Sequence, residues 1–200
     1  MYLPDYFKMA DADDVRTMIN AVPLAVLASH PDGALPADHL PLIMTKSKLI
    51  GHIAIANDLH ETLGDDQPVL AIFQGPDAYI SPNSYPSKAD THEVVPTWNY
   101  EVIHVHGRIR FHHDRRPKHG PVGMLTKLME TRTSGDAAWR MSDAPDAFMD
   151  EKLSQIVGLE IEIIETRAKS KLSQNKPDAD RLGASDGRGA NPIADRIRDV

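Results

Sequence analysis

The spacing of apolar residues near the start of the chain predicts an amphipathic helix over residues 11–22. Its apolar positions, Val15, Met18, Ile19 and Val22, follow an i, i+3, i+4, i+7 pattern and therefore share one face. Acidic residues fill the first turn, where the helix dipole favours negative charge. Pro23 follows directly and ends the helix.

Apolar runs farther along the chain predict a series of short β-strands. They cover residues 24–29, 35–44, 49–56, 69–75, 102–111 and 159–163. The run over residues 102–111 alternates most clearly, because its odd-numbered positions are mostly apolar and its even-numbered positions include histidine and arginine. A short helix over residues 57–64, capped by Asn57 or Asp58 and ended by Gly64, separates two of these strands.

Two helical patterns stand between the last two predicted strands. The first places Val122, Leu125, Leu128 and Met129 on one face. The second is capped by Ser142 or Asp143 and carries Met149, Leu153, Ile156 and Val157. Strands early in the chain, with helices at its start and late in it, indicate a mainly β (α+β) fold in which helices pack on an antiparallel β-barrel.

Domain organisation follows from the same pattern. Residues 1–172 are predicted to form the barrel domain with its helical additions, and residues 173–200 a polar C-terminal tail. From Gly183 onward the tail is small, polar and rich in glycine, which predicts flexibility at its end. Its glycines lack the GxxxxGK[ST] spacing of a phosphate-binding loop.

The segment over residues 73–100 stands between two predicted strands and is rich in proline and aromatic residues. It contains Pro76, Pro82, Pro86, Pro96 and Trp98. Loops longer than about 12–15 residues inside a compact domain are usually functional or disordered, and the aromatic residues argue against disorder. Two interpretations stay open: an ordered loop that covers the open end of a barrel, and a loop that contacts a ligand.

Composition narrows the class of protein. The 200 residues contain no cysteine, which excludes disulfides, thiolate catalysis and zinc fingers. We expect a cytoplasmic protein without a membrane partner, because the chain has neither a signal-peptide pattern nor a run of eighteen apolar residues. The net charge of −7 argues against autonomous DNA binding. A basic run, with Arg108, Arg110, Arg115, Arg116 and Lys118, leaves a local DNA-binding patch open.

Several motifs follow one another along the chain. They are MYLPDYF, ADHLPLIM, GHIAIAN, FQGPDAYISPNSYPSK, VPTWNY, WRMSDAP and KLSQNKPDADRLG, and they extend from Met1 to about Gly183. In this order they resemble the PaiB-type family of FMN-binding split-barrel proteins, which are described as negative transcriptional regulators. The resemblance implies a split antiparallel β-barrel with peripheral helices. It also implies a homodimer that binds FMN in the groove between its two copies.

The resemblance further implies which residues contact the flavin. Two strands after the first hairpin usually supply contacts, and their counterparts contribute His39, Pro41, Leu42, His52, Ala54 and Asn57. From the proline-rich segment and the residues after the last strand we expect Ser81, Lys88, Trp98, Asn99, Lys171, Ser173, Gln174 and Asn175. The superfamily usually carries Arg or Lys where this sequence has His39 and Asn57. We therefore expect Lys88 or Lys171 to supply the positive charge for the phosphate.

Each of these residues also has an interpretation without a ligand. His39 and His52 fit ordinary strand histidines, the polar residues after the last strand fit a segment returning to solvent, and Trp98 fits the core or a dimer interface. We assign no metal site, because the closely spaced His104 and His106 have no carboxylate at ligand spacing. No catalytic residue is assigned either, since the chain lacks a GxSxG motif.

Three hypotheses about function follow from the sequence. The first is an FMN-binding regulator that acts as a dimer, with DNA or a regulatory protein as its partner. The second is an FMN-dependent oxidoreductase acting on a small substrate, since a fold by itself does not fix function. The third is a related protein that has lost its flavin, because the usual Arg and Lys positions are changed.

Overall fold

The structure is a computed structural model that describes residues 1–200, except for the side chains at positions 32 and 115–117. Contacts divide the chain into two compact units, and each is described by itself. The barrel unit comprises Ile19–Phe73 and Val105–Thr166. The terminal unit comprises Met1–Met18, Gln74–His104 and Arg167–Val200.

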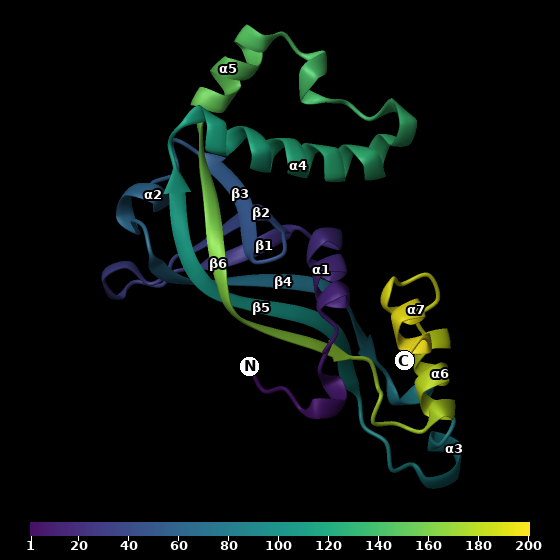
Figure 1. The fold of residues 1–200 in the computed structure, drawn as a ribbon. Helices are drawn as coiled ribbons and strands as arrows, with labels where there is room; N and C mark the ends of the chain where they lie inside the picture. The colour runs from purple at the N-terminus through teal and green to yellow at the C-terminus, as the bar shows by residue number, and fades with distance from the viewer. The chain divides into compact units, whose positions relative to one another are not determined.

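The strands form a closed antiparallel barrel in the order β1-β2-β3-β6-β5-β4 (Figure 1). They are β1 (Leu24–Ala28), β2 (Ala37–Met44), β3 (Lys48–Ala54), β4 (Gln67–Ile80), β5 (Thr97–His112) and β6 (Ile156–Lys171). The ladder between β3 and β6 joins Lys48 to Glu162 and Ala54 to Ile156. The antiparallel barrel predicted from the alternating apolar pattern is confirmed.

Alternate strand residues of the barrel unit form its core. Leu27, Leu42, Leu49, Val105, Ile109, Leu159 and Ile161 have no exposed surface. Between Val105 and Ile109, Gly107 allows β5 to approach β6 closely, since a Cβ atom there would lie 2.3 Å from the Glu162 carbonyl oxygen. Any larger residue at this position would push the two strands apart.

The residues between β5 and β6 form an arm, which we define as residues 115–154. It consists of α4 (Arg115–Ser134), the 3-10 turns η4 (Gly135–Ala137) and η5 (Met141–Asp143), and α5 (Asp146–Ser154). Helix α4 contacts β3, and Figure 1 shows the arm returning to the start of β6. The barrel unit also contains the short helix α2 (Leu59–Thr62), within the helix predicted over residues 57–64.

The second predicted arm helix is shorter than expected. Helix α5 begins after Pro145, whereas Ser142 and Asp143 belong to the preceding 3-10 turn. Ile156 and Val157 lie in β6, where they pair with Ala54 and Ile53 of β3. Apolar residues at these positions suit a helix face and a buried strand equally well, and strand pairing decided between them.

The helix predicted near the start of the chain is α1 (Ala12–Ala21). Two other predictions, for residues 73–100 and for the end of the chain, differ from the structure of the terminal unit. The segment over residues 73–100 is not one long loop, because β4 continues to Ile80 and β5 begins at Thr97. Ala78 and Ile80 are buried and Tyr79 is exposed, so the alternation of a strand continues past Pro76. Between the strands lie the 3-10 turn η3 (Pro82–Ser84) and α3 (Lys88–Thr91).

The segment expected to be a flexible tail contains α6 (Asp178–Asp186) and α7 (Ile193–Arg198). Ile193 and Ile197, one helical turn apart, have no exposed surface. They belong to a hydrophobic cluster with Ala78, Ile80, Tyr85, Leu172 and Ala184. Gly183 lets α6 approach η3, since a Cβ atom there would lie 2.2 Å from the Ser84 carbonyl oxygen. The small residues of this segment thus serve close packing.

Candidate functional site

A small polar pocket lies in the terminal unit, where β5 begins and β6 ends. Its volume is about 190 Å³, and its lining consists of Val95, Pro96, Thr97, Asn99, Lys171, Ser173, Asn175 and Lys176. Four of these, Asn99, Lys171, Ser173 and Asn175, are candidate flavin contacts from the sequence. The structure therefore brings together residues that are more than 70 positions apart in the chain.

The floor of this polar pocket is a buried hydrogen bond between Asn99 and Ser173. The Asn99 amide Nδ2 lies 2.9 Å from the Ser173 hydroxyl, and the Asn99 side chain is fully buried. Ser173 has a φ of +67°, a left-handed conformation that is uncommon for residues other than glycine. This turn directs Ser173 back toward β5 instead of letting the strand continue, and the Ser173 carbonyl accepts a hydrogen bond from the Lys176 amide.

Lys171 supplies a partly buried positive charge to the pocket. Its Nζ donates to the Thr97 hydroxyl and to the Trp98 carbonyl, both at 2.6 Å. Burial lowers the pKa of Lys171, with the neighbouring Lys169 as a lesser cause in the same direction. Because burial without a counter-ion disfavours the ammonium form, an anion in this pocket would be stabilised by Lys171 and would raise its pKa again.

Lys176 and the side-chain amide of Asn175 complete the polar lining. Lys176 Nζ lies 5.0 Å from the centre of the Tyr85 ring, a cation–π distance that holds the lysine stem without neutralising its charge. Thr97, Val95, Pro96 and Lys176 were not among the candidates from the sequence. Alternation along β5 was the signal for Thr97, because it places residues 97 and 99 on the same face of the strand.

Gln174 contributes to the turn and not to the pocket. Its side chain accepts a hydrogen bond from the Leu172 amide at 2.7 Å and donates one to the Ser170 carbonyl at 2.6 Å. Both ends of the amide are thus used by the main chain of the same turn. Gln174 fixes the conformation that presents Ser173 and Asn175.

An ion pair between the half-exposed Arg196 and the buried Glu101 anchors the strand ends that carry the pocket. Glu101, only 2% exposed, accepts hydrogen bonds from Arg196 Nε at 3.0 Å and from Arg196 Nη2 at 2.8 Å. The Ser170 hydroxyl donates to the same carboxylate at 2.8 Å. Arg196 belongs to α7, so the segment expected to be a flexible tail is tied to β5 and β6 next to the pocket.

The structure separates Trp98 from this pocket. Successive strand residues face opposite sides, so Trp98 points away from Thr97 and Asn99. Its indole is 54% exposed and meets the Tyr79 ring edge to face, with centroids 6.1 Å apart. Trp98 therefore does not lie in the core, which was one of the positions that the sequence left open for it.

Ser81 and Lys88 both bind Asn83 and do not line the polar pocket. The Ser81 hydroxyl accepts from the Asn83 amide, which caps η3. The Lys88 ammonium donates to the Asn83 side-chain carbonyl at 2.5 Å. Of the two lysines proposed to bind a phosphate, Lys171 therefore lines a pocket, and Lys88 is held by Asn83.

The remaining candidates lie on β2 and β3 of the barrel unit, except Asn57, which follows β3. Leu42 is fully buried, whereas Ala54 and His39 are exposed. Burial lowers the pKa of His52, and its Nδ1 atom is buried with no hydrogen-bond partner among the described residues. Asn57 donates to Asp38 at 2.9 Å and accepts from the Leu59 amide at 2.8 Å, so it binds the first amide of α2, whose N-cap residue is Asp58. Pro41 pairs with Leu24 of β1.

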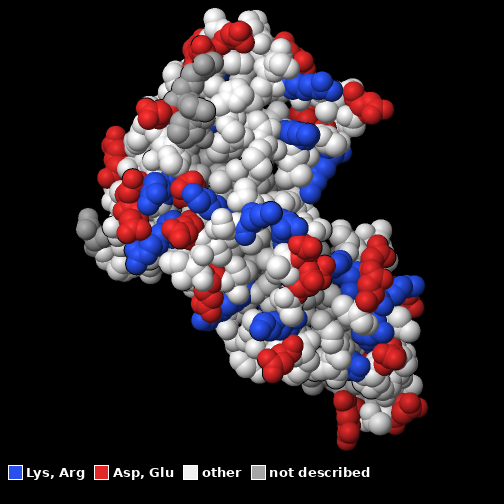
Figure 2. All heavy atoms as spheres, viewed as in Figure 1, with Lys and Arg blue, Asp and Glu red and all other residues white. Residues whose placement is uncertain are grey.

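Among the described side chains of the basic run over residues 108–118, one lysine is buried and one arginine is bound to a carbonyl. Lys118 is 5% exposed and its Nζ donates to the Leu153 carbonyl, while Arg108 binds the Asp66 carbonyl. Arg115 and Arg116 lie outside the described side chains. On the face shown in Figure 2, Lys and Arg side chains are interspersed with Asp and Glu.

Two further searches concern metals and membranes. Within the described part of the chain, no group of three or more His, Asp and Glu side chains is placed to hold a metal ion. A search of the same residues found no helix with the length and apolar character needed to cross a membrane.

Comparison with solved structures defines the class of fold. A conserved hypothetical protein from Mycobacterium tuberculosis matches with a TM-score of 0.63 and 12% identity, over 88% of this chain and 94% of the other. A flavocytochrome from Azotobacter vinelandii matches with a TM-score of 0.61 and 14% identity, over 84% and 72% of the two chains. The fold is that of the flavin-binding split barrels.

Comparison of sequences identifies the family. The chain belongs to the family described as "Putative FMN-binding domain", whose model matches residues 1–165. It is also 30% identical to the Bacillus subtilis "Protease synthase and sporulation protein PAI 2", over 91% of this chain and 86% of that protein. The resemblance to PaiB-type proteins is confirmed, and FMN is the cofactor that family membership supports. Four residues of the polar pocket, Lys171, Ser173, Asn175 and Lys176, lie beyond the part matched by the family model.

Proposed function

We propose that this protein is a cytoplasmic homodimer that binds FMN non-covalently and acts as a negative regulator of transcription. Family membership, together with a polar pocket that contains two lysines, carries the flavin part of the proposal. The regulatory part is supported by the resemblance to PaiB-type proteins and by the name of the Bacillus subtilis relative, a "Protease synthase and sporulation protein". Neither the flavin part nor the regulatory part of the proposal is argued from the net charge of −7.

The chemistry of the polar pocket suits a phosphate group. Ammonium groups, a threonine hydroxyl and side-chain amides are the donors that bind phosphate oxygens in proteins. The volume of about 190 Å³ lies below the roughly 300–1,000 Å³ of pockets that enclose a whole drug-sized ligand. The pocket therefore accommodates the FMN phosphate, and the flavin ring lies outside it.

The residues of the pocket have distinct roles in this proposal. Lys171 and Lys176 would neutralise the phosphate, and Thr97 and Asn175 would donate hydrogen bonds to its oxygens. The bond between Asn99 and Ser173 holds the lining in place and leaves no buried amide unpaired at that point. FMN, when bound, supplies a ring that accepts or gives up electrons.

Spectroscopic titration with FMN tests the flavin site. The purified protein is mixed with FMN and dialysed, and bound flavin is measured from its visible absorption. We expect Lys171→Met to raise the dissociation constant for FMN by about tenfold or more, because a charge-assisted hydrogen bond to the phosphate is lost. Lys171→Arg keeps the charge and should bind more tightly than Lys171→Met.

Lys88→Met is the matched control, because it removes a lysine that Asn83 already holds. Equal weakening by Lys88→Met and Lys171→Met would reject the polar pocket as the phosphate site. Retention of no flavin by the wild-type protein would reject FMN binding itself and favour the hypothesis of a related protein that has lost its flavin.

Sedimentation and DNA binding test the regulatory part. A homodimer should sediment at twice the mass of the chain. Fragments selected from genomic DNA should be retained, and retention should fall steeply between about 50 and 200 mM salt. Turnover of a reduced nicotinamide, without retention of any DNA fragment, would instead support the FMN-dependent oxidoreductase.

A further inference from the structure

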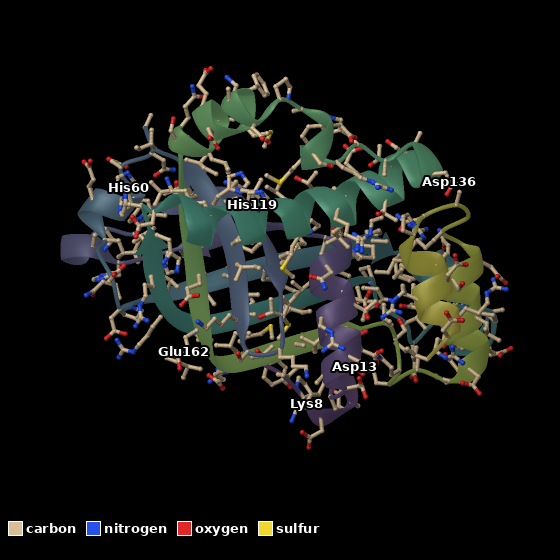
Figure 3. All side chains as sticks on the ribbon, turned by 45° about the horizontal axis from the view of Figure 1, so that its top comes forward. Lys8, Asp13, His60, His119, Asp136 and Glu162 are labelled. Carbon is tan, nitrogen blue, oxygen red and sulfur yellow. The ribbon has the colours of Figure 1, made fainter. Side chains whose placement is uncertain are left out.

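A second cavity, of about 610 Å³, lies inside the arm between α4 and residues 135–142. One side of α4 provides His119, Gly123, Thr126, Lys127 and Thr131. The opposite wall consists of Gly135, Asp136, Ala138, Trp139, Arg140, Met141 and Ser142. Figure 3 labels His119 and Asp136, which lie toward opposite ends of α4. From residue 119 to 131 the helix rises about 18 Å, so this arm cavity is elongated.

The wall opposite α4 is held in place by hydrogen bonds within the arm. The Glu130 carboxylate accepts from the Trp139 amide at 3.1 Å and from the Ser134 hydroxyl at 3.4 Å. The Asp143 carboxylate accepts from the Arg140 amide at 2.9 Å. The main chain around Trp139 is therefore fixed against α4 before any ligand arrives, which reduces the cost of ordering on binding.

The arm cavity combines apolar surface with positive charge. Trp139, Met141 and Ala138 supply the apolar part, and Trp139 is 42% exposed. In the described part of the chain, the Lys127 ammonium and the Arg140 guanidinium have no hydrogen-bond or ion-pair partner. Asp136 is the acidic residue of the lining, so Lys127 and Arg140 leave the cavity positively charged.

We propose that the arm cavity binds a small aromatic carboxylate. The aromatic ring would lie against Trp139 and Met141, and the carboxylate would bind Lys127 and Arg140, since Arg and Lys donate charge-assisted hydrogen bonds to carboxylates. A volume of about 610 Å³ falls in the range of small-molecule sites. The proposal does not rest on the flavin site, because the polar pocket belongs to the terminal unit.

Titration with 2-naphthoate tests this proposal. Trp98 and Trp139 are the two tryptophans of the chain, so the Trp98→Phe variant isolates the fluorescence of Trp139. We expect saturable quenching of Trp139 in the full-length variant. Calorimetry on the wild-type protein should give the same dissociation constant. The neutral analogue 2-naphthalenemethanol should bind about tenfold more weakly, because it lacks the charge.

Single substitutions locate the bound carboxylate. Lys127→Met and Arg140→Met should each weaken 2-naphthoate binding about tenfold. Both residues are exposed and their charged groups are unpaired in the described structure, so neither substitution endangers folding. Lys152→Met is the matched control, because Lys152 lies in α5, outside the cavity lining, next to Glu151.

Four outcomes would overturn the proposal. They are no quenching at about 1 mM 2-naphthoate, equal binding of the neutral analogue, equal weakening by Lys152→Met, and displacement of 2-naphthoate by FMN. The last result would make the arm cavity a flavin site. Lys171→Met separates the two proposals, since it should weaken FMN binding and leave 2-naphthoate binding unchanged.

Discussion

The two groups of candidate flavin contacts differ in what their polar side chains do. In the barrel unit, Leu42 of β2 is fully buried in the core, and Asn57, which follows β3, accepts from the first amide of α2. At the ends of β5 and β6 in the terminal unit, Asn99, Lys171 and Ser173 enclose a pocket. Of the two groups, the second includes four residues that line the polar pocket.

The difference follows from the backbone that carries each group. Residues 37–54 form a regular hairpin, in which the ladder uses the main-chain groups and the side chains stand on the sheet surface. After Lys171 the strand stops, Ser173 takes a left-handed conformation, and the chain turns back. An irregular turn beside a rigid strand directs several side chains toward one point, which a regular ladder does not do.

Removal of the ion pair behind the polar pocket should have the largest effect. Arg196→Ala leaves the Glu101 carboxylate buried without its cation. We expect a loss of about 3–5 kcal/mol in the free energy of unfolding, measured by urea denaturation. FMN binding should weaken as well, because α7 is then no longer tied to Glu101 of β5 beside the pocket.

Arg181→Ala is the control for this experiment. Arg181 also lies in the terminal unit, but it binds main-chain carbonyls of α7 and the exposed Asp178 instead of a buried carboxylate. An equal loss of stability in both variants would show that the buried charge of Glu101 is not the cause.

A matched pair of asparagines sharpens the comparison between the two groups. Asn99→Ala leaves the Ser173 hydroxyl buried without its partner and should lower the free energy of unfolding by about 2 kcal/mol. Asn57→Ala removes the hydrogen bonds to Asp38 and from the Leu59 amide and should lower it by about 1 kcal/mol. FMN titration should show the larger loss of affinity for Asn99→Ala. A larger loss of FMN affinity for Asn57→Ala would place the binding site at the candidates of the barrel unit instead of at the polar pocket.

The smallest effect concerns His52 and pH. Burial lowers its pKa below the ordinary 6.5, so the unfolded chain takes up a proton at a higher pH than the folded protein does. The contribution of neutral His52 to stability is therefore complete above pH 6.5 and is lost as the pH falls through the lowered pKa.

Urea denaturation at about pH 8 and about pH 5 checks this prediction. The wild-type protein should lose more stability between these two values than His52→Gln, which has no group to titrate at this position. Equal losses in the two proteins would mean that protonation of His52 does not differ between the folded and unfolded states.

Much of the fold follows directly from the apolar pattern of the chain. Leu27, Val105 and Ile109 stand at alternating strand positions, and all three are buried where the alternation predicts. The pattern fails at Pro76 and after Gly183, since proline and glycine are typical of loops. In the structure Pro76 lies inside β4, and Gly183 is part of α6. Gly183 packs against Ser84, and Ala78 and Ile80 of the same strand as Pro76 pack in a cluster with Leu172, which sequence spacing does not reveal.

The polar pocket was foreseen in part. Lys171, Ser173 and Asn175 were candidates because they belong to a motif shared with a family, and alternation would have added Thr97. The pairing of Asn99 with Ser173 depends on a contact across 74 positions and on an unusual φ angle. Neither has a signature in the local sequence, because serine has no general preference for the left-handed conformation.

The order of segments in the terminal unit has a consequence for synthesis on the ribosome. Lys8 and Lys169 form an isolated antiparallel β-bridge, and the Lys169 ammonium donates to the Tyr2 carbonyl. Residues near Met1 therefore need partners that are translated much later. At about 5–20 residues per second, the interval between Met18 and Arg167 lasts roughly 7–30 s.

Each hairpin among β1, β2 and β3 needs only microseconds to form once it has emerged from the ribosome. The edge of β3 then has no strand partner until β6 has been translated. Nascent chains of this protein are exposed to aggregation until β6 has been translated, and slower translation would lengthen the exposure.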